Sequence, residues 1–352
     1  MINVRFANIN DQEKWDNYVY NNQKASPYHL FAWNISIQGA YGHKIFNLIA
    51  EENDNIKGIL PLTYINPPLL PGTLYSLPFC DIGGILSDNE TTSNKLFDSA
   101  LDISKSLGNV DLSIRKRETS NYNVIDFNTS EYTDKKVSML LKLPSSSNTL
   151  WDSFKSKLRS QIKKAEKNGL QFQYGNKITH VDYFFDVFSR NMKKLGSPCH
   201  SYMWFAELNK NYGNNMTIGI VTKDGKAVGA GILLFVDKCA AIPWASTLSD
   251  YNPLAPNMLL YWNLLKIACD RGCNIFDFGR STYGEGTFRF KEQWGAVPVQ
   301  LSWKTFSANG NLKLTRNMNS LQIRAYAEKV WRILPVNITN RIGPFTRKYI
   351  SL

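Results

Sequence analysis

One short stretch of the sequence combines glycines, cations and aromatic residues more densely than a core strand requires. The stretch is FDFGRSTYGEGTFRFKEQWG, residues 276–295. Gly284 and Gly286 would let the backbone turn tightly and approach a ligand closely. If a strand follows them, Arg289 and Lys291 share one of its faces. Two cations beside a glycine loop suit an anion or oxyanion site, and two solvent-facing cations on an edge strand are an equally weighted alternative.

A second candidate for anion binding is the basic segment WDSFKSKLRSQIKKAEKNGL, residues 151–170. An apolar stripe at three- and four-residue spacing predicts a single helix that ends at Gly169. Between Lys155 and Lys167 its other faces carry six Lys or Arg residues against one acid, Glu166, which destabilises the helix unless an anion neutralises them. We expect phosphate binding there as readily as a solvated face, with Lys157, Arg159 and Lys163 as the candidate contacts.

The elements that must position these residues form two weakly similar units. Each reads strand, strand, helix, strand, and each helix ends at a glycine suited to a left-handed cap. The first unit closes with GNVDLSIR and the second with GCNIFDFGR. This order predicts an α+β fold with two domains of the same type, and it resembles the acyltransferase fold called GNAT. Pro144 and the serines after it predict a domain boundary near residue 145.

Composition limits the classes of partner. The 352 residues carry a net charge of +12, which favours nucleic acid, a phosphorylated substrate or an anionic membrane surface as a partner. Five scattered cysteines do not indicate disulfides, and no histidine lies near them in a metal-binding pattern, so we expect no metal. The N-terminal segment has no apolar signal and the longest apolar run is short, so we expect a cytoplasmic protein.

Several stretches resemble the Fem family, whose FemA-, FemB- and FemX-type members add amino acids to peptidoglycan precursors. They include DFGRS, FRFKEQWGAVPVQLSW and the basic segment. The stretches SPYHLFAW, YGHK, IKGILPL, SLPFCDIGGIL, NMKKLGSP and KVWRILPVNITNRIGP are most similar to the FemAB-related proteins associated with exosortase and exopolysaccharide systems.

The resemblance implies two GNAT-like domains in tandem, residues 1–145 plus 308–352 and residues 146–307. It implies an aminoacyltransferase that moves an aminoacyl group from aminoacyl-tRNA to an amine of a phosphorylated or lipid-linked envelope precursor. In that pattern the lysine of the pair Phe290-Lys291 is catalytic and stabilises the oxyanion. The basic helix and Arg280 would then hold phosphate. Such a protein needs no cofactor and could lie peripherally at the inner face of the membrane.

Two departures from the Fem pattern weaken the assignment of the acceptor. Members that use a UDP-linked precursor carry a lysine about one turn after the first domain's tryptophan, whereas Trp33 here is followed by Asn34, Ile35, Ser36 and Ile37. The long helical arm of some members is also missing after Gly169.

Two other functions remain open. One is a CoA-dependent N- or O-acyltransferase acting on an envelope saccharide, although the segment STLSDYNPLAPN contains prolines where such enzymes carry glycines. The other is a non-catalytic saccharide-binding protein that uses the many aromatic residues. The general base is not determined: Asp277 is a weak candidate, and His29, His43 and His200 are each better explained as structural.

Overall fold

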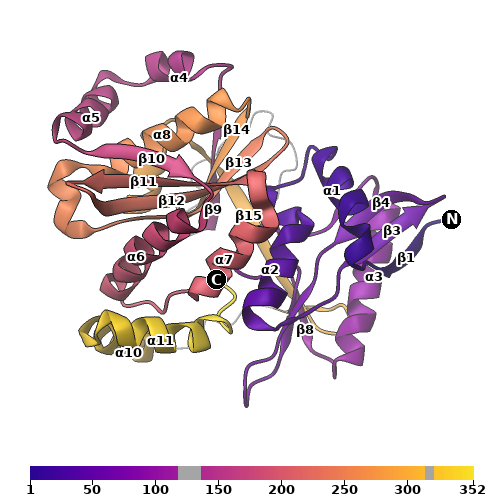
Figure 1. Ribbon diagram of the computed structural model, residues 1–352. Coiled ribbons are helices and arrows are strands. Elements are labelled where there is room, and N and C mark those ends of the chain that lie inside the picture. The colour runs from indigo at the N-terminus through magenta and orange to yellow at the C-terminus, as the bar shows by residue number, and fades with distance from the viewer. Residues whose placement is uncertain (118–135, 314–320) are drawn as a thin grey trace. The chain divides into compact units, whose positions relative to one another are not determined.

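The structure is a computed structural model that describes residues 1–117, 136–313 and 321–352, with side chains in 321–326 left out (Figure 1). The chain divides into two compact units. The first comprises Met1–Ser138, Val299–Asn317 and Tyr349–Leu352, and the second comprises Met139–Pro298 and Met318–Lys348. Among the described residues, no helix is both long and apolar enough to cross a bilayer.

The first unit contains two groups of strands. One is an antiparallel set in the order β1 (Asn3–Phe6), β3 (Leu48–Glu52), β4 (Asn55–Leu60) and β7 (Leu86–Ser87). The other has the order β15, β8, β6, β5, β2, in which only β6 and β8 pair in parallel and β16 joins the outside of β15. Their bounds are β2 Lys44–Ile45, β5 Thr63–Ile65, β6 Thr73–Tyr75, β8 Asp111–Arg117, β15 Val297–Phe306 and β16 Leu312–Lys313.

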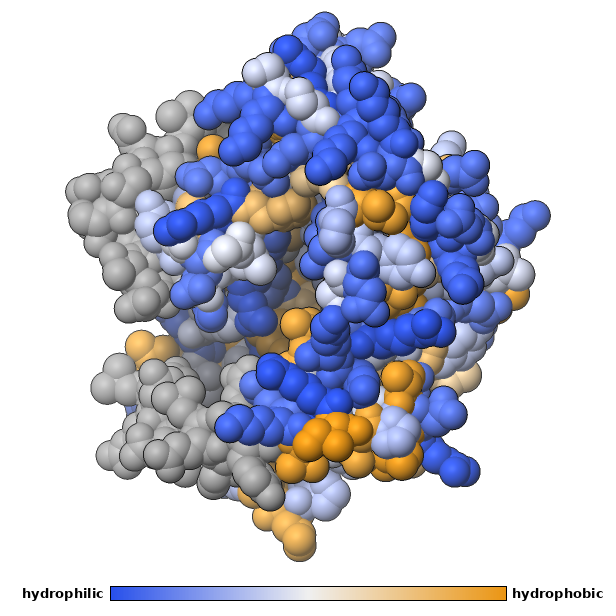
Figure 2. All heavy atoms as spheres, turned by 90° about the vertical axis from the view of Figure 1, so that its left-hand side faces the viewer, coloured by the Kyte–Doolittle hydropathy of each residue, from blue (hydrophilic) through white to orange (hydrophobic). Residues whose placement is uncertain are grey.

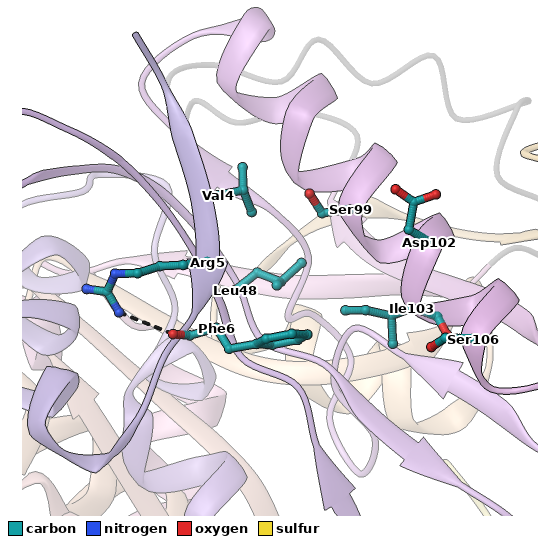
Figure 3. Close-up of a pocket in the computed structure, with 8 residues that line it drawn as sticks. All are labelled: Val4, Arg5, Phe6, Leu48, Ser99, Asp102, Ile103 and Ser106. Atoms are coloured by element: carbon teal, nitrogen blue, oxygen red, sulfur yellow. Dashed lines mark hydrogen bonds between the residues drawn. The ribbon is translucent and has the colours of Figure 1, made fainter.

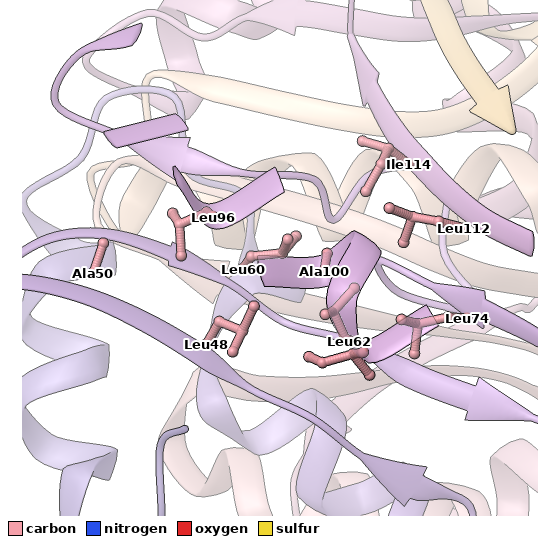
Figure 4. Close-up of a cluster of buried hydrophobic side chains, with 10 residues drawn as sticks. Leu48, Ala50, Leu60, Leu62, Leu74, Leu96, Ala100, Leu112 and Ile114 are labelled. Atoms are coloured by element: carbon pink, nitrogen blue, oxygen red, sulfur yellow. The ribbon is translucent and has the colours of Figure 1, made fainter. Parts of the chain in front are cut away.

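Helix α3 (Glu90–Ser106) supplies one side of the first unit's core. It begins at Asn89, whose side chain accepts a hydrogen bond from the Thr92 N–H and so caps the helix. Leu96, Ala100 and Ile103 recur at helical spacing and belong to one buried cluster, in which Leu96 and Ala100 lie among the strand residues (Figure 4). The remaining core members are Leu48, Ala50, Leu60, Leu62, Leu74, Leu112 and Ile114. Helices α1 (Gln12–Tyr20) and α2 (Phe31–Tyr41) complete the unit.

The second unit has a sheet in the order β10, β11, β12, β13, β14, β9. The bounds are β9 Lys136–Lys142, β10 Gln171–Gly175, β11 Met216–Lys223, β12 Lys226–Val236, β13 Cys239–Thr247 and β14 Ile275–Thr282. Helices α6 (Ile178–Leu195) and α8 (Pro256–Asp270) both pack on β11 and β12, from opposite faces of the sheet (Figure 1). Helix α7 (Tyr202–Tyr212) packs beside α6.

The sheet of the second unit opens between β13 and β14. These parallel strands pair only where Cys239–Ala241 meets Ile275–Asp277. Beyond Ala241, the ladder of β13 continues only with β12 and reaches Thr247. The β12–β13 register shifts between Ile232 and Leu234, an irregularity of the kind that bends a strand. Among the described residues, this opening leaves part of the β13 backbone edge without a strand partner on the β14 side.

The predicted repeat agrees with the observed elements: α3 and α8 are the two helices, and β8 and β14 are the strands that close the copies. The boundaries differ from the prediction. We expected residues 308–352 to complete the first domain, but α10 (Leu321–Ile333) and α11 (Val336–Arg347) pack on α6 of the second unit. Only Tyr349–Leu352 returns to the first unit, and Val299–Phe306 of β15 also belongs there because it extends the ladder to β8.

The basic segment forms two helices rather than one. Helix α4 (Ser147–Ser153) ends at Phe154, whose backbone is extended, and α5 (Ser156–Lys167) begins after Lys155. Phe154 is buried, and its ring packs 5.5 Å from that of Trp294 and 5.8 Å from that of Trp262. This packing favours the break, because a continuous helix would not place the Phe154 ring in the same way.

Candidate functional site

The glycine-rich stretch forms a turn and a short helix, α9 (Gly286–Glu292), where we predicted a strand. On a helix, Phe288 and Lys291 are one turn apart and both are buried, whereas Arg289 is exposed. The prediction that Arg289 and Lys291 share a face is therefore wrong. The burial of Phe288 explains why the prediction fails. On a helix Lys291 lies one turn after Phe288, so its side chain is buried on the same face. Gly284 has a positive φ of 75°, as the turn requires.

Lys291 is bound to the end of strand β14. Its side chain is 8% exposed, and its Nζ donates to the carbonyl oxygens of Gly279 at 3.1 Å and Arg280 at 2.8 Å. The Asp277 carboxylate accepts a hydrogen bond from the Gly279 N–H at 2.8 Å. Gly279 has a φ of +73°, so these contacts stabilise a bend in the strand that glycine tolerates best. Asp277 is buried and serves this bend.

Ser281 follows directly on β14 and has a buried hydroxyl. Its Oγ has no hydrogen-bond partner among the described residues. A buried polar atom without a partner is unusual and commonly marks a place that a ligand or water completes. The sequence offered no signal for Ser281, because a single serine in a strand is ordinary.

Aromatic rings surround this part of the second unit. Tyr261 of α8 lies 5.8 Å from Phe278 of β14 and 4.9 Å from Phe290 of α9, measured between ring centroids. Trp294 is buried and packs on both Phe290 and Phe154. Burial raises the pKa of the Tyr261 hydroxyl well above its usual value. These rings lower the local dielectric, so a cation such as Lys291 acts more strongly there than in water.

A pocket of about 540 Å³ lies beside Trp294. It is formed by the end of β9, helix α4 and the residues that follow α9. Lys142 and Lys155 line it together with one acid, Glu292. The indole Nε1 of Trp294 is buried without a partner among the described residues. The pocket thus combines two cations with a tryptophan whose indole N–H has no acceptor among the described residues.

Helix α5 carries the predicted phosphate-binding cations. Lys157 and Lys163 are exposed, and the Lys163 ammonium lies 5.9 Å from the centre of the Trp151 ring. Arg159 is different: its Nη1 donates to the carbonyl oxygens of Asp152 at 3.2 Å and Phe154 at 2.6 Å. These are carbonyls at the end of α4 that lack helical partners, so Arg159 joins the two helices.

The second unit has a cationic pocket of about 560 Å³ that we did not predict from the sequence. The end of α6, the loop after β13 and the junction of α10 and α11 line it, and its cations are Arg190, Lys193, Lys194 and Arg332. Asp250 also lines the pocket and pairs with Lys194 at 3.2 Å. The Asn191 amide donates to the Ser246 hydroxyl at 3.1 Å, which places this pocket next to the end of β13. The run of basic residues ending α6 was the available signal.

The loop between β13 and α8 is poorly suited to a pyrophosphate cradle. Ala255 has a positive φ of 64°, and Pro256 begins α8 without an N–H group. The Met258 N–H donates to the Ala255 carbonyl. Binding of a pyrophosphate at a helix N-terminus depends on N–H groups that point at the ligand. The observed geometry agrees with our interpretation that the segment STLSDYNPLAPN is poorly suited to hold the pyrophosphate of CoA.

The three histidines that were considered as general bases, His29, His43 and His200, are all buried. His29 is buried, and burial lowers its pKa to about 4 while its ring contacts Ser26 and Gly84. His200 is buried against Trp204 and Trp244, and burial lowers its pKa well below the usual range. His43 packs among aromatic rings. Within the same residues no three His, Cys, Asp or Glu side chains gather as metal ligands.

The first unit has a shallower pocket of about 370 Å³ between β1, β3 and α3 (Figure 3). Its cation, Arg5, already pairs with Asp11 at 2.8 Å and Glu51 at 3.0 Å. Its hydroxyl groups belong to Ser99 and Ser106, which donate to carbonyls of α3. This pocket therefore offers little chemistry compared with the sites of the second unit.

Comparison with known proteins gives these sites a context. Residues 152–292 match the sequence family described as "Acetyltransferase (GNAT) domain". Over 165 residues the chain is 24% identical to the UDP-N-acetylmuramoylpentapeptide-lysine N(6)-alanyltransferase of Weissella viridescens. That alignment covers 46% of this chain and 48% of the relative, so the chain matches about half of the relative's length.

Solved structures extend the likeness of fold to most of the chain. FemX aligns with a TM-score of 0.66 and 13% identity, over 85% of this chain and 95% of FemX. A tandem GNAT protein from the clavulanic acid biosynthesis pathway aligns with a TM-score of 0.52 and 10% identity, over 88% of this chain and 99% of that protein. The predicted fold, two GNAT-like domains in tandem, is confirmed. The chain thus resembles FemX in fold, and its residues 152–292 match the GNAT domain family.

Proposed function

We propose that the chain is an aminoacyltransferase whose second unit moves an aminoacyl group from aminoacyl-tRNA to an amine of a cell-envelope precursor. The observation that carries this proposal is Lys291, a buried cation fixed at the end of β14 in the GNAT-type unit. The alanyltransferase relative supports the class of reaction. The association with exosortase or exopolysaccharide systems stays a prediction.

The reaction needs a stabilised oxyanion. The acceptor amine attacks the ester carbonyl of the donor, forming a C–N bond and a tetrahedral intermediate with negative charge on oxygen. Collapse of the intermediate breaks the ester C–O bond, and the tRNA ribose hydroxyl leaves after taking up the proton that the amine loses. The positive charge of Lys291, held in a buried position, would stabilise the oxyanion; such a contact contributes about 3 kcal/mol to lowering the barrier.

The choice of donor rests on charge and on the start of α8. Lys157 and Lys163 are exposed on α5 and would contact tRNA phosphates. Pro256 removes one N–H group from the place where a GNAT enzyme would hold the pyrophosphate of CoA. Acyl-CoA therefore remains the second candidate donor, with less support. The acceptor would place phosphate in the cationic pocket of Arg190, Lys193, Lys194 and Arg332.

A non-catalytic saccharide-binding role has less support. Sugar binding by stacking needs accessible ring faces. Trp204 is fully buried, and Tyr261 and Trp262 are partly buried and pack against other aromatic side chains. Trp204 therefore offers no accessible face for stacking, and the other two rings are partly covered.

Donor binding tests the proposal directly. Purified protein is titrated with alanyl-tRNA, uncharged tRNA and acetyl-CoA at low and moderate salt, and each titration is followed by transfer to an amine-bearing precursor. Selective binding of the charged tRNA with transfer supports the proposal. Saturable binding of acetyl-CoA with acetyl transfer replaces it with the CoA-dependent activity. Absence of both activities in folded protein overturns both.

A further inference from the structure

Helix α11 buries its small and polar residues and exposes its apolar ones. Thr339 is 2% exposed and Gly343 is buried, whereas Ile338, Ile342 and Phe345 are 44%, 41% and 68% exposed. The three exposed residues recur at spacings of four and three, so they form one stripe. A helix on the surface of a globular protein normally has the opposite arrangement.

Close packing prevents α11 from turning its isoleucines inward. A Cβ atom at Gly343 would lie 3.2 Å from the backbone nitrogen of Cys199 and 3.4 Å from the ring of Trp331. The face of α11 that contacts the rest of the second unit therefore has room for glycine and not for a large side chain. The outward orientation of the apolar stripe is thus built into the packing of this helix.

The end of α10, just before α11 in the chain, adds two more exposed apolar residues. Ile333 is 82% exposed and Val330 is 42% exposed. We call Val330, Ile333, Ile338, Ile342 and Phe345 the C-terminal apolar face. Figure 2 shows hydrophobic residues gathered low on the molecule, level with α10 and α11 in Figure 1. Contiguous apolar surface of this kind marks an interaction site more often than scattered single residues do.

Cations accompany the C-terminal apolar face. Residues 327–348 contain one acid, Glu328, and five basic residues, Lys329, Arg332, Arg341, Arg347 and Lys348. Lys329, Arg332 and Arg341 are exposed. Apolar side chains with Lys and Arg beside them are the pattern of helices that lie in the interface of an anionic bilayer. Each cation near such a surface adds to the attraction.

We propose that the C-terminal apolar face docks on an anionic lipid bilayer, with Ile333 and Phe345 inserted and the arginines at the headgroups. A second copy of the chain fits less well, because a two-fold contact through this face would bring the same cations together. Arg332 and Val336 of this helix pair also line the cationic pocket, which would therefore lie near the membrane surface. The inference goes beyond the proposed function, since docking requires neither donor nor acceptor.

Flotation of the full chain with vesicles tests the proposal. One set of vesicles is phosphatidylcholine and the other is phosphatidylcholine mixed with phosphatidylglycerol. We expect the chain to bind the vesicles that contain phosphatidylglycerol, and we expect this binding to weaken as the salt concentration rises. A triple variant that combines Ile338→Ser, Ile342→Ser and Phe345→Ser should bind these vesicles about tenfold or more weakly. A matched control variant replaces Ile178, Tyr183 and Met203 of the same unit with serine. These residues are 52%, 45% and 50% exposed, and the control variant should bind vesicles like the wild type.

Two further measurements keep the result interpretable. Thermal unfolding should be unchanged in the triple variant, because its side chains are exposed. If that variant unfolds instead, Arg332→Glu with Arg341→Glu tests the charge alone and should abolish the preference for anionic vesicles. The proposal is overturned if the wild type floats with neither set, or if the folded triple variant floats like the wild type. It is also overturned if ultracentrifugation finds a dimer that the triple variant loses while vesicles remain unbound.

Discussion

The ammonium of Lys291 lies 2.8 Å from the carbonyl oxygen of Arg280, and this contact ties helix α9 to the end of strand β14. The side chain is buried, so its charge has one position relative to the strand rather than a range of positions. A fixed charge stabilises a transition state better than a mobile one, because it does not have to reorganise as the reaction proceeds.

Replacement of Lys291 with methionine keeps most of the length of the side chain and removes its charge. We expect the transfer rate constant kcat to fall by about a hundredfold, with a smaller change in KM for the donor. Single-turnover transfer from alanyl-tRNA measures this. Lys266→Met, at an exposed lysine of α8, is the matched control. Full activity in a folded Lys291→Met protein would contradict the proposed role.

The same substitution should also lower stability. The carbonyls of Gly279 and Arg280 would lose a buried donor, which costs about 1–3 kcal/mol. Urea unfolding of Lys291→Met and Lys291→Arg separates this effect from catalysis. Lys291→Arg keeps a charge and donors, and we expect it to recover part of the activity as well as part of the stability.

The basic residues of α5 should act in two different ways. Lys157→Met with Lys163→Met should weaken tRNA binding and reduce the slope of log K against log salt by about one to two units, because up to two phosphate contacts are lost. Arg159→Met should instead destabilise the second unit by about 1–3 kcal/mol, since carbonyls at the end of α4 lose their donor. Filter binding across salt concentrations and urea unfolding distinguish these outcomes. Equal salt slopes for the wild type and the double lysine variant would rule out the phosphate contacts.

The cationic pocket should bind inorganic pyrophosphate. Lys193→Ala should reduce the affinity by about tenfold, as the loss of one charge-assisted hydrogen bond costs about 1.5 kcal/mol or more. Titration calorimetry of the full chain measures the affinity. Lys226→Ala, at an exposed lysine of the same unit, should leave it unchanged. Undiminished binding in Lys193→Ala would place the anion elsewhere.

Asp16 gives a pH-dependent test of the first unit. Burial raises the pKa of its carboxyl to about 6, although the carboxylate accepts a 2.8 Å hydrogen bond from the Phe31 N–H. The folded state therefore binds the proton more tightly than the unfolded state, and ionisation destabilises the fold as pH rises through 6. Asp16→Asn keeps the acceptor and removes the charge. We expect it to be more stable than the wild type by up to about 3 kcal/mol at pH 7.5, a difference that shrinks as pH falls toward 4. A constant difference across this range would contradict the assignment.

Local patterns in the sequence were sufficient to predict much of the fold. The strand–strand–helix–strand repeat identified both α3 and α8 because each helix has a glycine-containing end and an apolar stripe. The short stretch after Gly286 was predicted incorrectly. Its alternating residues, Phe288 to Lys291, suit a strand as well as a helix, and the choice between them depends on burial of Phe288 against Tyr283.

Other features depend on contacts between distant residues. The cationic pocket combines residues 190–194 with 248–250 and Arg332, and no sequence window contains all of them. The break at Phe154 depends on Trp262 and Trp294, more than a hundred residues later. Helices α10 and α11 were assigned to the first domain because an apolar stripe alone does not identify the surface that covers it.

The return of Tyr349–Leu352 to the first unit has a consequence for the order of folding during synthesis. Arg115, which is 4% exposed, donates to the Ser351 carbonyl at 3.1 Å and to its hydroxyl at 2.8 Å. The Phe79 N–H donates to the same carbonyl at 2.7 Å. Domains on a ribosome usually fold from the N-terminus onward. In this chain the first unit needs β15 and then Ser351, which are synthesised after all strands of the second unit. The sheet of the second unit is therefore complete while the first unit still lacks a strand.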